Sequence, residues 1–136
     1  MTIPEGVKNV GGAFESSGIE KIELPDTVEG NDLEFSSCIH LKEIRLPENT
    51  TKIRNNAFRV CSSLENIVLP EGLTEIGAGA FAFCNSLERI VIPESVTYID
   101  SDAFMDCRNL KEVVIRGDPV IEKNAFNGCG ALENKP

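Results

Sequence analysis

The stretch "GAFAFCNSLERIVIPES", residues 79–95, decides the fold, because the chain repeats its pattern at a fixed distance on both sides. "NAFRVCSSLENIVLPEG" begins 23 residues earlier and "DAFMDCRNLKEVVIRGD" begins 23 residues later. The repeated phenylalanine occurs with a spacing of 21 to 23 residues, at Phe14, Phe35, Phe58, Phe81, Phe104 and Phe126. A period of this length over the whole chain is typical of a solenoid, in which each coil packs on the next.

Each unit contains a short strand followed by a proline. Ile67 and Leu69 are two residues apart, and so are the apolar pairs of the other units, which places both members of a pair on one strand face. The proline, as at Pro70, lacks a backbone N–H and therefore predicts the end of strand pairing. Aligned coils would stack these strands into a parallel sheet at roughly 4.8 Å per coil.

The segment Ala-Phe-x-x-Cys predicts the outer wall of the coil. Phe81 and Cys84 are three residues apart, which is the spacing of one side of a helical turn, and Ala80 is small enough to lie against the next coil. We therefore expect a short helix or turn here.

Length and charge restrict the class of protein. The 136 residues, 41% hydrophobic and 26% charged, fit one domain over residues 1–136. A formal net charge of -9 argues against nucleic acid or an anionic membrane as partner. No apolar run approaches the roughly 20 residues of a membrane-spanning helix, and the start "MTIPEGVKNVGG" lacks a signal segment. These features predict a cytosolic chain or a piece of a longer protein, without membrane insertion.

The full unit, with Leu64, Ile67, Leu69, Pro70 and Ala80-Phe81, resembles the BspA-like leucine-rich-repeat family. The resemblance implies an α/β leucine-rich-repeat solenoid of about five and a half coils. It would have a parallel sheet on the concave face and short helices or turns on the convex face. It also implies a non-enzymatic adhesion module of a bacterial surface or secreted protein. The partner would be a host or cell-surface protein, and the chain could self-associate through the solenoid ends or the concave face.

Two units depart from the pattern. The second has Glu34 in the alanine position and Asn31 near an isoleucine position, which predicts an irregular outer wall. In the last complete unit Arg116 replaces the proline, and the chain stops just as another strand would begin. Such ends predict a fragment of a longer repeat array, or a protein whose ends are covered.

One cysteine occurs in each of five units, at Cys38, Cys61, Cys84, Cys107 and Cys129. Metal sites favour close cysteine pairs, and a disulfide framework favours an even count. Parallel side chains on neighbouring coils would also hold the Cβ atoms farther apart than a disulfide allows. We therefore expect buried, reduced cysteines that act as small apolar side chains.

The candidate catalytic and metal-binding residues are few. His40 is the only histidine and falls in a predicted surface turn, so a catalytic role is disfavoured and no enzyme is expected. Asp26, Glu48, Glu71 and Glu94 should form an acidic row, but one carboxylate per coil supplies too few oxygens for calcium. We expect neither a metal nor a cofactor.

The exposed side of the strands carries the candidate binding residues. Between the two buried strand positions lie Val68, Val91 and Val114, which would form an apolar stripe on the concave face. Strand propensity alone would also explain these valines. The predicted protein-binding set is Arg45, Val68, Val91, Val114, Asn66, Arg89 and Glu112. A structural spacer within a larger surface protein, with no ligand of its own, is the alternative.

Overall fold

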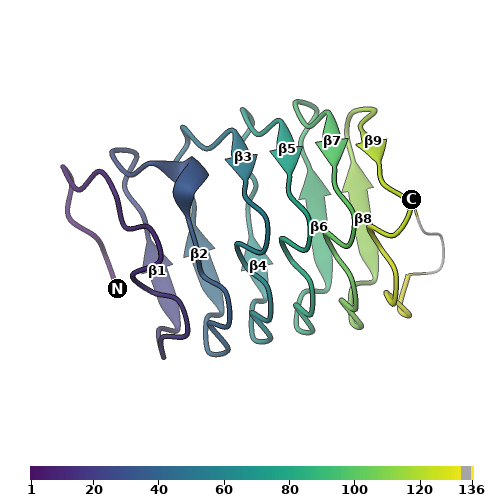
Figure 1. The fold of residues 1–136 in the computed structure, drawn as a ribbon, viewed down its shortest axis with the longest axis horizontal. Coiled ribbons are helices and arrows are strands. Elements are labelled where there is room, and N and C mark those ends of the chain that lie inside the picture. Colours follow the sequence, from purple (N-terminus) through teal and green to yellow (C-terminus); the bar gives the residue numbers. More distant parts are fainter. Residues whose placement is uncertain (133–135) are drawn as a thin grey trace.

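The computed structural model describes residues 1–132 and 136, and it is a solenoid of very short strands (Figure 1). The strands are β1 (Lys21–Glu23), β2 (Glu43–Arg45), β3 (Lys52–Ile53), β4 (Asn66–Ile67), β5 (Glu75–Ile76), β6 (Arg89–Ile92), β7 (Tyr98–Ile99), β8 (Glu112–Ile115) and β9 (Val120–Ile121). One 3-10 helix, η1 (Gly30–Asp32), completes the secondary structure of the described residues. The two termini lie at opposite ends of the row of coils.

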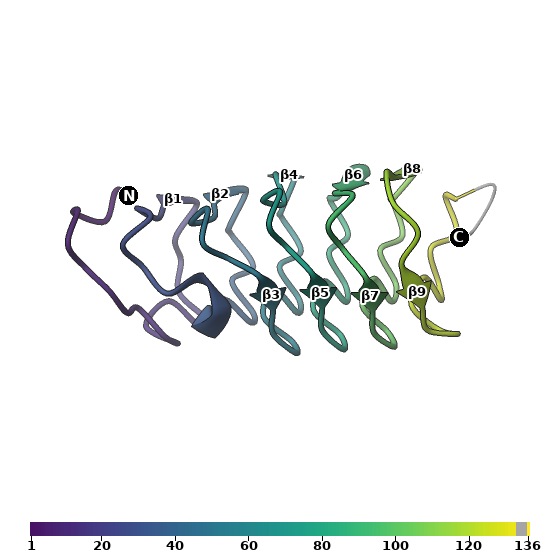
Figure 2. The ribbon, with the colours of Figure 1, turned by 90° about the horizontal axis from the view of Figure 1, so that it is seen from above.

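The strands form two faces, which Figure 2 shows on opposite sides of the row of coils. We call the face with β1-β2-β4 and β6-β8 the main face, and the face with β3-β5-β7-β9 the second face. All pairs are parallel, and equivalent residues of successive coils are in register, as for Ile22 and Ile44. The expectation of a single sheet is therefore wrong. Because each second-face strand has only two residues, it shows no apolar alternation in the sequence.

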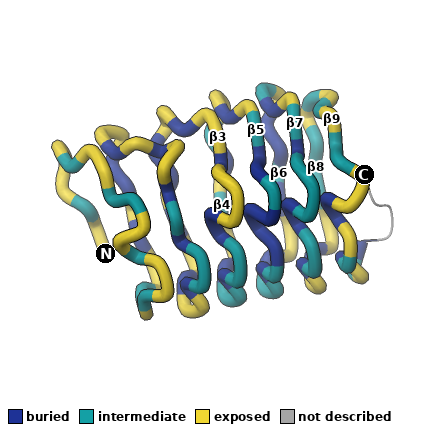
Figure 3. The backbone as a smooth tube through the Cα atoms, in the orientation of Figure 1, coloured by how far each residue is buried: buried dark blue, intermediate teal, exposed yellow. Residues whose placement is uncertain are grey.

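The core is a set of columns that run along the solenoid axis (Figure 3). Neighbouring rings of the repeated phenylalanine are stacked, with centroids 5.1 to 5.8 Å apart and planes within 8° of parallel. Phe35, Phe58, Phe81 and Phe104 are fully buried. Burial of a Phe side chain contributes on the order of 1.5 to 3 kcal/mol, so stacking of coils supplies the stability that a single coil lacks.

The outer wall consists of turns, which were one of the two expected alternatives, and the α/β description is not confirmed because this wall has no helix among the described residues. The N–H of Cys61 donates to the Phe58 carbonyl at 3.2 Å, which closes a single turn. The N–H groups of Phe58 and Val60 instead donate to Ala80 and Ala82 of the next coil, both at 2.8 Å. An α-helix would need these N–H groups for bonds to carbonyls four residues back. Hydrogen bonds between coils therefore replace helical ones.

The same wall contains a row of residues with left-handed backbone. Ser37, Val60, Phe83, Asp106 and Gly128 occupy equivalent positions with φ between 54° and 78°. Such a conformation is unusual for a β-branched or bulky residue and costs roughly 1 to 2 kcal/mol. The inter-coil hydrogen bonds of the wall hold Val60 and Phe83 in this conformation.

The five cysteines are buried and free, which confirms the expected reduced packing side chains. The structure adds a polar role. Each Sγ donates to the phenylalanine carbonyl of the preceding coil at 2.8 to 3.3 Å, as Cys61 does to Phe35 and Cys84 does to Phe58. The thiol is thus a second donor to a buried carbonyl that already accepts the backbone hydrogen bond of its turn, as at Phe58.

The second unit is irregular, as expected, and η1 takes the place of a second-face strand. The Asn31 side chain replaces the missing strand backbone, because its Oδ1 accepts from the N–H groups of Thr51 at 2.8 Å and Lys52 at 3.1 Å. Gly30 is required nearby, since a Cβ at that position would lie 1.9 Å from the Thr50 Oγ1. The predicted count of about five and a half coils is not confirmed, because the longest continuous sheet has four strands.

Candidate functional site

All seven predicted binding residues lie on the main face, on or directly after strands β2, β4, β6 and β8. Arg89 pairs in register with Glu112, and Val91 with Val114. Val68 follows β4 and is 83% exposed, whereas Val91 and Val114 are half-buried. Arg45, Asn66, Arg89 and Glu112 are exposed. The structure thus brings the set together, while its role in binding and the concave curvature of this face stay predictions.

The main face is split between β4 and β6. In the described residues no backbone hydrogen bond joins these two strands, although they belong to neighbouring coils. At the start of the other strands the N–H of Glu65 donates to Lys42, and that of Lys111 donates to Glu88, at 3.0 and 2.8 Å. The equivalent N–H of Glu88 has no such partner. The split is local, since β5 and β7 of the same coils remain paired on the second face.

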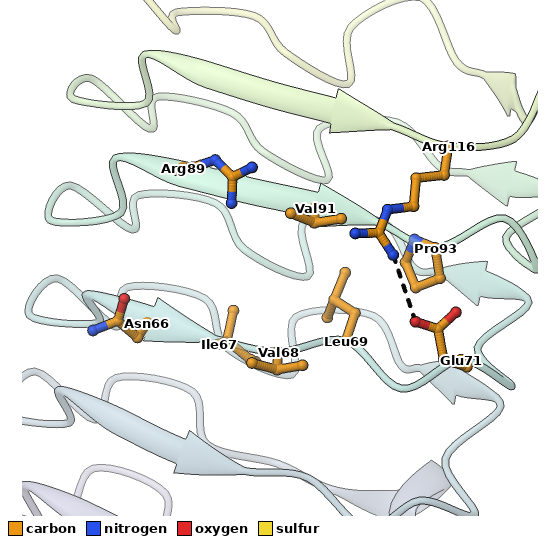
Figure 4. A pocket seen from close by; sticks show the side chains of 9 residues that line it. All are labelled: Asn66, Ile67, Val68, Leu69, Glu71, Arg89, Val91, Pro93 and Arg116. Carbon is orange, nitrogen blue, oxygen red and sulfur yellow. Dashed lines mark ion pairs between the residues drawn. The ribbon is translucent and has the colours of Figure 1, made fainter.

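A groove of about 380 Å³ lies over the split (Figure 4). Val68 and Val91 line it from the two sides, and Pro93 lies beside Val91. A second hollow of about 510 Å³, with Glu65, Ser86, Glu88 and Asn109 in its wall, adjoins the groove through the shared residues Asn66 and Arg89. We call the two adjoining hollows the furrow. Its proline end contains Val68, Val91 and Pro93 together with the charged Glu71 and Arg116, and its other end is polar.

The predicted binding set lacks two charged residues of this groove, Arg116 and Glu71, and also the apolar Ile67, Leu69 and Pro93. Figure 4 shows the Arg116 side chain reaching across Pro93 toward the coil of β4, where it forms an ion pair with Glu71 at 3.8 Å. The signal was visible, because Arg116 replaces the proline of the other units. Only the structure shows that this side chain extends over one whole coil, between residues 45 positions apart.

Ion pairs between neighbouring coils cover the rest of the main face. Lys21 contacts Glu43 at 3.1 Å, and this hydrogen bond raises the pKa of Lys21. The N–H of Glu48 donates to Asp26 at 2.9 Å and lowers the pKa of that carboxyl group, with help from Arg45. Water screens exposed pairs of this kind, so they align neighbouring coils more than they stabilise the fold.

The other candidates form no site in the described residues. His40 is exposed, as expected. Within the described part of the chain no group of three or more His, Cys, Asp or Glu side chains could hold a metal ion. None of the described helices is long and apolar enough to cross a membrane. On the second face, the Tyr98 hydroxyl donates to Glu122 at 2.8 Å, and this bond raises the pKa of Tyr98 to about 12.

Comparison with known proteins identifies the family. The model of the BspA-type leucine-rich-repeat region matches residues 8–133, in six copies. The chain belongs to the BspA-type leucine-rich-repeat family. The resemblance inferred from the repeat is thereby confirmed. No curated protein matches the sequence.

Solved structures of bacterial leucine-rich-repeat proteins resemble this BspA-type chain. A leucine-rich cell surface protein from Faecalibacterium prausnitzii shares 35% identity at a TM-score of 0.77, over 87% of this chain and 32% of that one. A leucine-rich-repeat protein from Bacteroides ovatus shares 30% identity at a TM-score of 0.82, over 97% and 38%. The T. pallidum leucine-rich-repeat protein shares 30% identity at 0.74, over 98% and 77%. The chain thus spans about a third of the length of the first two.

Proposed function

We propose that this chain is a non-enzymatic protein-interaction module of a bacterial surface or secreted protein, and that it binds its partner through the main face. The groove over the split is the observation that carries the proposal. Val68 is 83% exposed there and faces the half-buried Val91, and a hollow lined by apolar side chains with a few polar groups is typical of a binding site. Repeat solenoids present extended faces of this kind to their partners. The resemblance to a cell surface protein supports the location.

A spacer without a ligand is the second candidate function, and one observation favours it. The phenylalanine rings stack across all six units at 5.1 to 5.8 Å, so the coils form one stiff row. A stiff row of coils would hold neighbouring domains apart without binding anything through its faces.

A pair of matched variants separates the two functions. Val68→Glu places a charge in the groove, while Val120→Glu places one on β9 of the second face, where the valine is 62% exposed. Because both side chains are largely in water, both variants should melt close to the wild-type temperature. Capture of surface proteins from an extract, and self-association in the ultracentrifuge, should be lost in Val68→Glu alone. Equal association by wild type and both variants would contradict binding through this face and favour the spacer.

A further inference from the structure

Two departures from the repeat coincide at the groove between β4 and β6. The inter-strand hydrogen bonds are missing there, and Arg116 replaces the proline of the other units. Both lower the local regularity of the main face, since a sheet gains from its ladder of hydrogen bonds. Local departures of this kind concentrate at functional sites.

The apolar part of the groove is suited to one side chain. Val68 and Val91 face it from neighbouring coils, and Pro93 lies at its end (Figure 4). The coils stay in contact below it, because the rings of Phe58 and Phe81 stack at 5.3 Å. A whole strand therefore cannot enter between the coils, whereas a side chain of an extended segment that lies along the furrow can.

The charges of the groove favour a carboxylate. Its lining contains Arg89, Arg116 and a single carboxylate, Glu71. The groove beside β1, by contrast, contains Glu5, Glu23 and Asp26 against Arg45. The lining of the groove over the split thus has one more cation than anions, whereas the lining of the groove beside β1 has two more anions than cations.

The existing ion pair is easily exchanged. The Arg116 and Glu71 side chains are 58% and 79% exposed and 3.8 Å apart, which makes their pair weak. Arg89 pairs with Glu112 on the side away from β4, and both of these side chains are also more than half exposed. A partner carboxylate could therefore replace Glu71 at little cost and gain a charge-assisted bond in a less exposed setting.

We propose that the groove binds an extended segment of a partner protein in which an apolar side chain is flanked by carboxylates. The apolar side chain lies between Val68 and Val91, and a carboxylate replaces Glu71 at Arg116. This inference rests on the proposed function, because it names the kind of partner that the main face would take.

The test uses a defined probe. A blocked heptapeptide with a central leucine flanked by aspartates is added to the ¹⁵N-labelled chain, and backbone amide shifts are followed at low and physiological salt. Two further peptides carry lysine or asparagine in place of the aspartates. The aspartate peptide should shift the amides of Val68, Arg89, Val91 and Arg116. The asparagine peptide should bind more weakly and the lysine peptide should not bind.

Charge variants then identify the contact. Arg116→Gln should lower the affinity for the aspartate peptide about fivefold to tenfold, because one charge-assisted pair is lost. Arg116→Lys should retain part of the affinity. Arg108→Gln, which removes an exposed arginine outside the groove, should leave binding unchanged.

Each contrary result overturns the inference. These results are no binding of the aspartate peptide, shifts away from the groove, equal binding of the lysine peptide, or an unchanged affinity in Arg116→Gln. The proposed function is judged separately by Val68→Glu. If that variant still loses its protein partner while no peptide binds, the inference alone fails.

Discussion

At the scale of single residues, the cysteine is the most informative side chain of each unit. Burial raises the pKa of Cys61 to about 12, and it also raises the pKa of Cys38 and Cys84 above the ordinary range. The folded chain thus keeps its thiols protonated at a pH where the unfolded chain has lost these protons. Stability from these groups is complete below the pKa of an unfolded thiol, about 8.5, and falls as pH rises above it.

We therefore expect the free energy of unfolding to decrease between pH 8.5 and 10, by up to about 1.4 kcal/mol per pH unit for each buried thiol. Urea unfolding under reducing conditions at several pH values measures this slope. Cys61→Ala should be less stable at pH 7 but should lose less stability per pH unit than wild type. Identical slopes for the two proteins would contradict the buried, protonated state of Cys61.

At the scale of elements, the structure shows that neighbouring coils decide what a short segment becomes. The second coil has η1 instead of a strand, and Asn31 supplies the acceptor that strand backbone supplies elsewhere. The Oδ1 of Asn31 accepts two N–H bonds, and its Nδ2 donates to the Thr51 Oγ1 at 3.0 Å. The regularity of β3 therefore depends on one side chain.

Removing that side chain should destabilise the chain. Asn31→Ala leaves the N–H groups of Thr51 and Lys52 without their protein acceptor, at an expected cost of about 1 to 2 kcal/mol. Asn31→Asp keeps the acceptor oxygen and should cost less. Asn124→Ala removes an exposed asparagine that has no side-chain hydrogen bond among the described residues, and it should melt as wild type does. Equal melting temperatures for Asn31→Ala and Asn124→Ala would show that the Asn31 side chain does not replace a strand carbonyl as hydrogen-bond acceptor.

The sequence predicted the elements unevenly, and the reason is physical. Strand positions such as Ile90 and Ile92 were predictable, because apolar residues that recur every second position indicate a strand. The three-residue spacing of Phe81 and Cys84 fits both a helical turn and a turn that is held by hydrogen bonds between coils. Only the next coil decides which carbonyls accept from the N–H groups of this segment. The split at β4 depends on how two coils are placed relative to each other, so the repeat pattern could not predict it. The exposure of Val68 was predicted, while the contact of Arg116 with Glu71 was not.

At the scale of the whole molecule, the regular stacking of the coils and the split of the main face have different roles. The second face runs unbroken through β3, β5, β7 and β9, and it keeps the coils in register with the phenylalanine column. The main face opens between β4 and β6 without loss of the core, because Ile90 and Ile92 remain buried. A rigid solenoid can therefore carry a groove on one side, and the whole functional account depends on that opening.

Amide hydrogen exchange of the wild-type chain tests the opening most directly. The N–H groups of Lys42, Glu65 and Lys111 donate to the preceding coil at 2.7 to 3.0 Å, whereas the equivalent N–H of Glu88 makes no such bond. We predict slow exchange at Lys42, Glu65 and Lys111 and fast exchange at Glu88. A Glu88 amide as slow as that of Lys111 would mean a continuous main face, and it would contradict the split on which the binding groove rests.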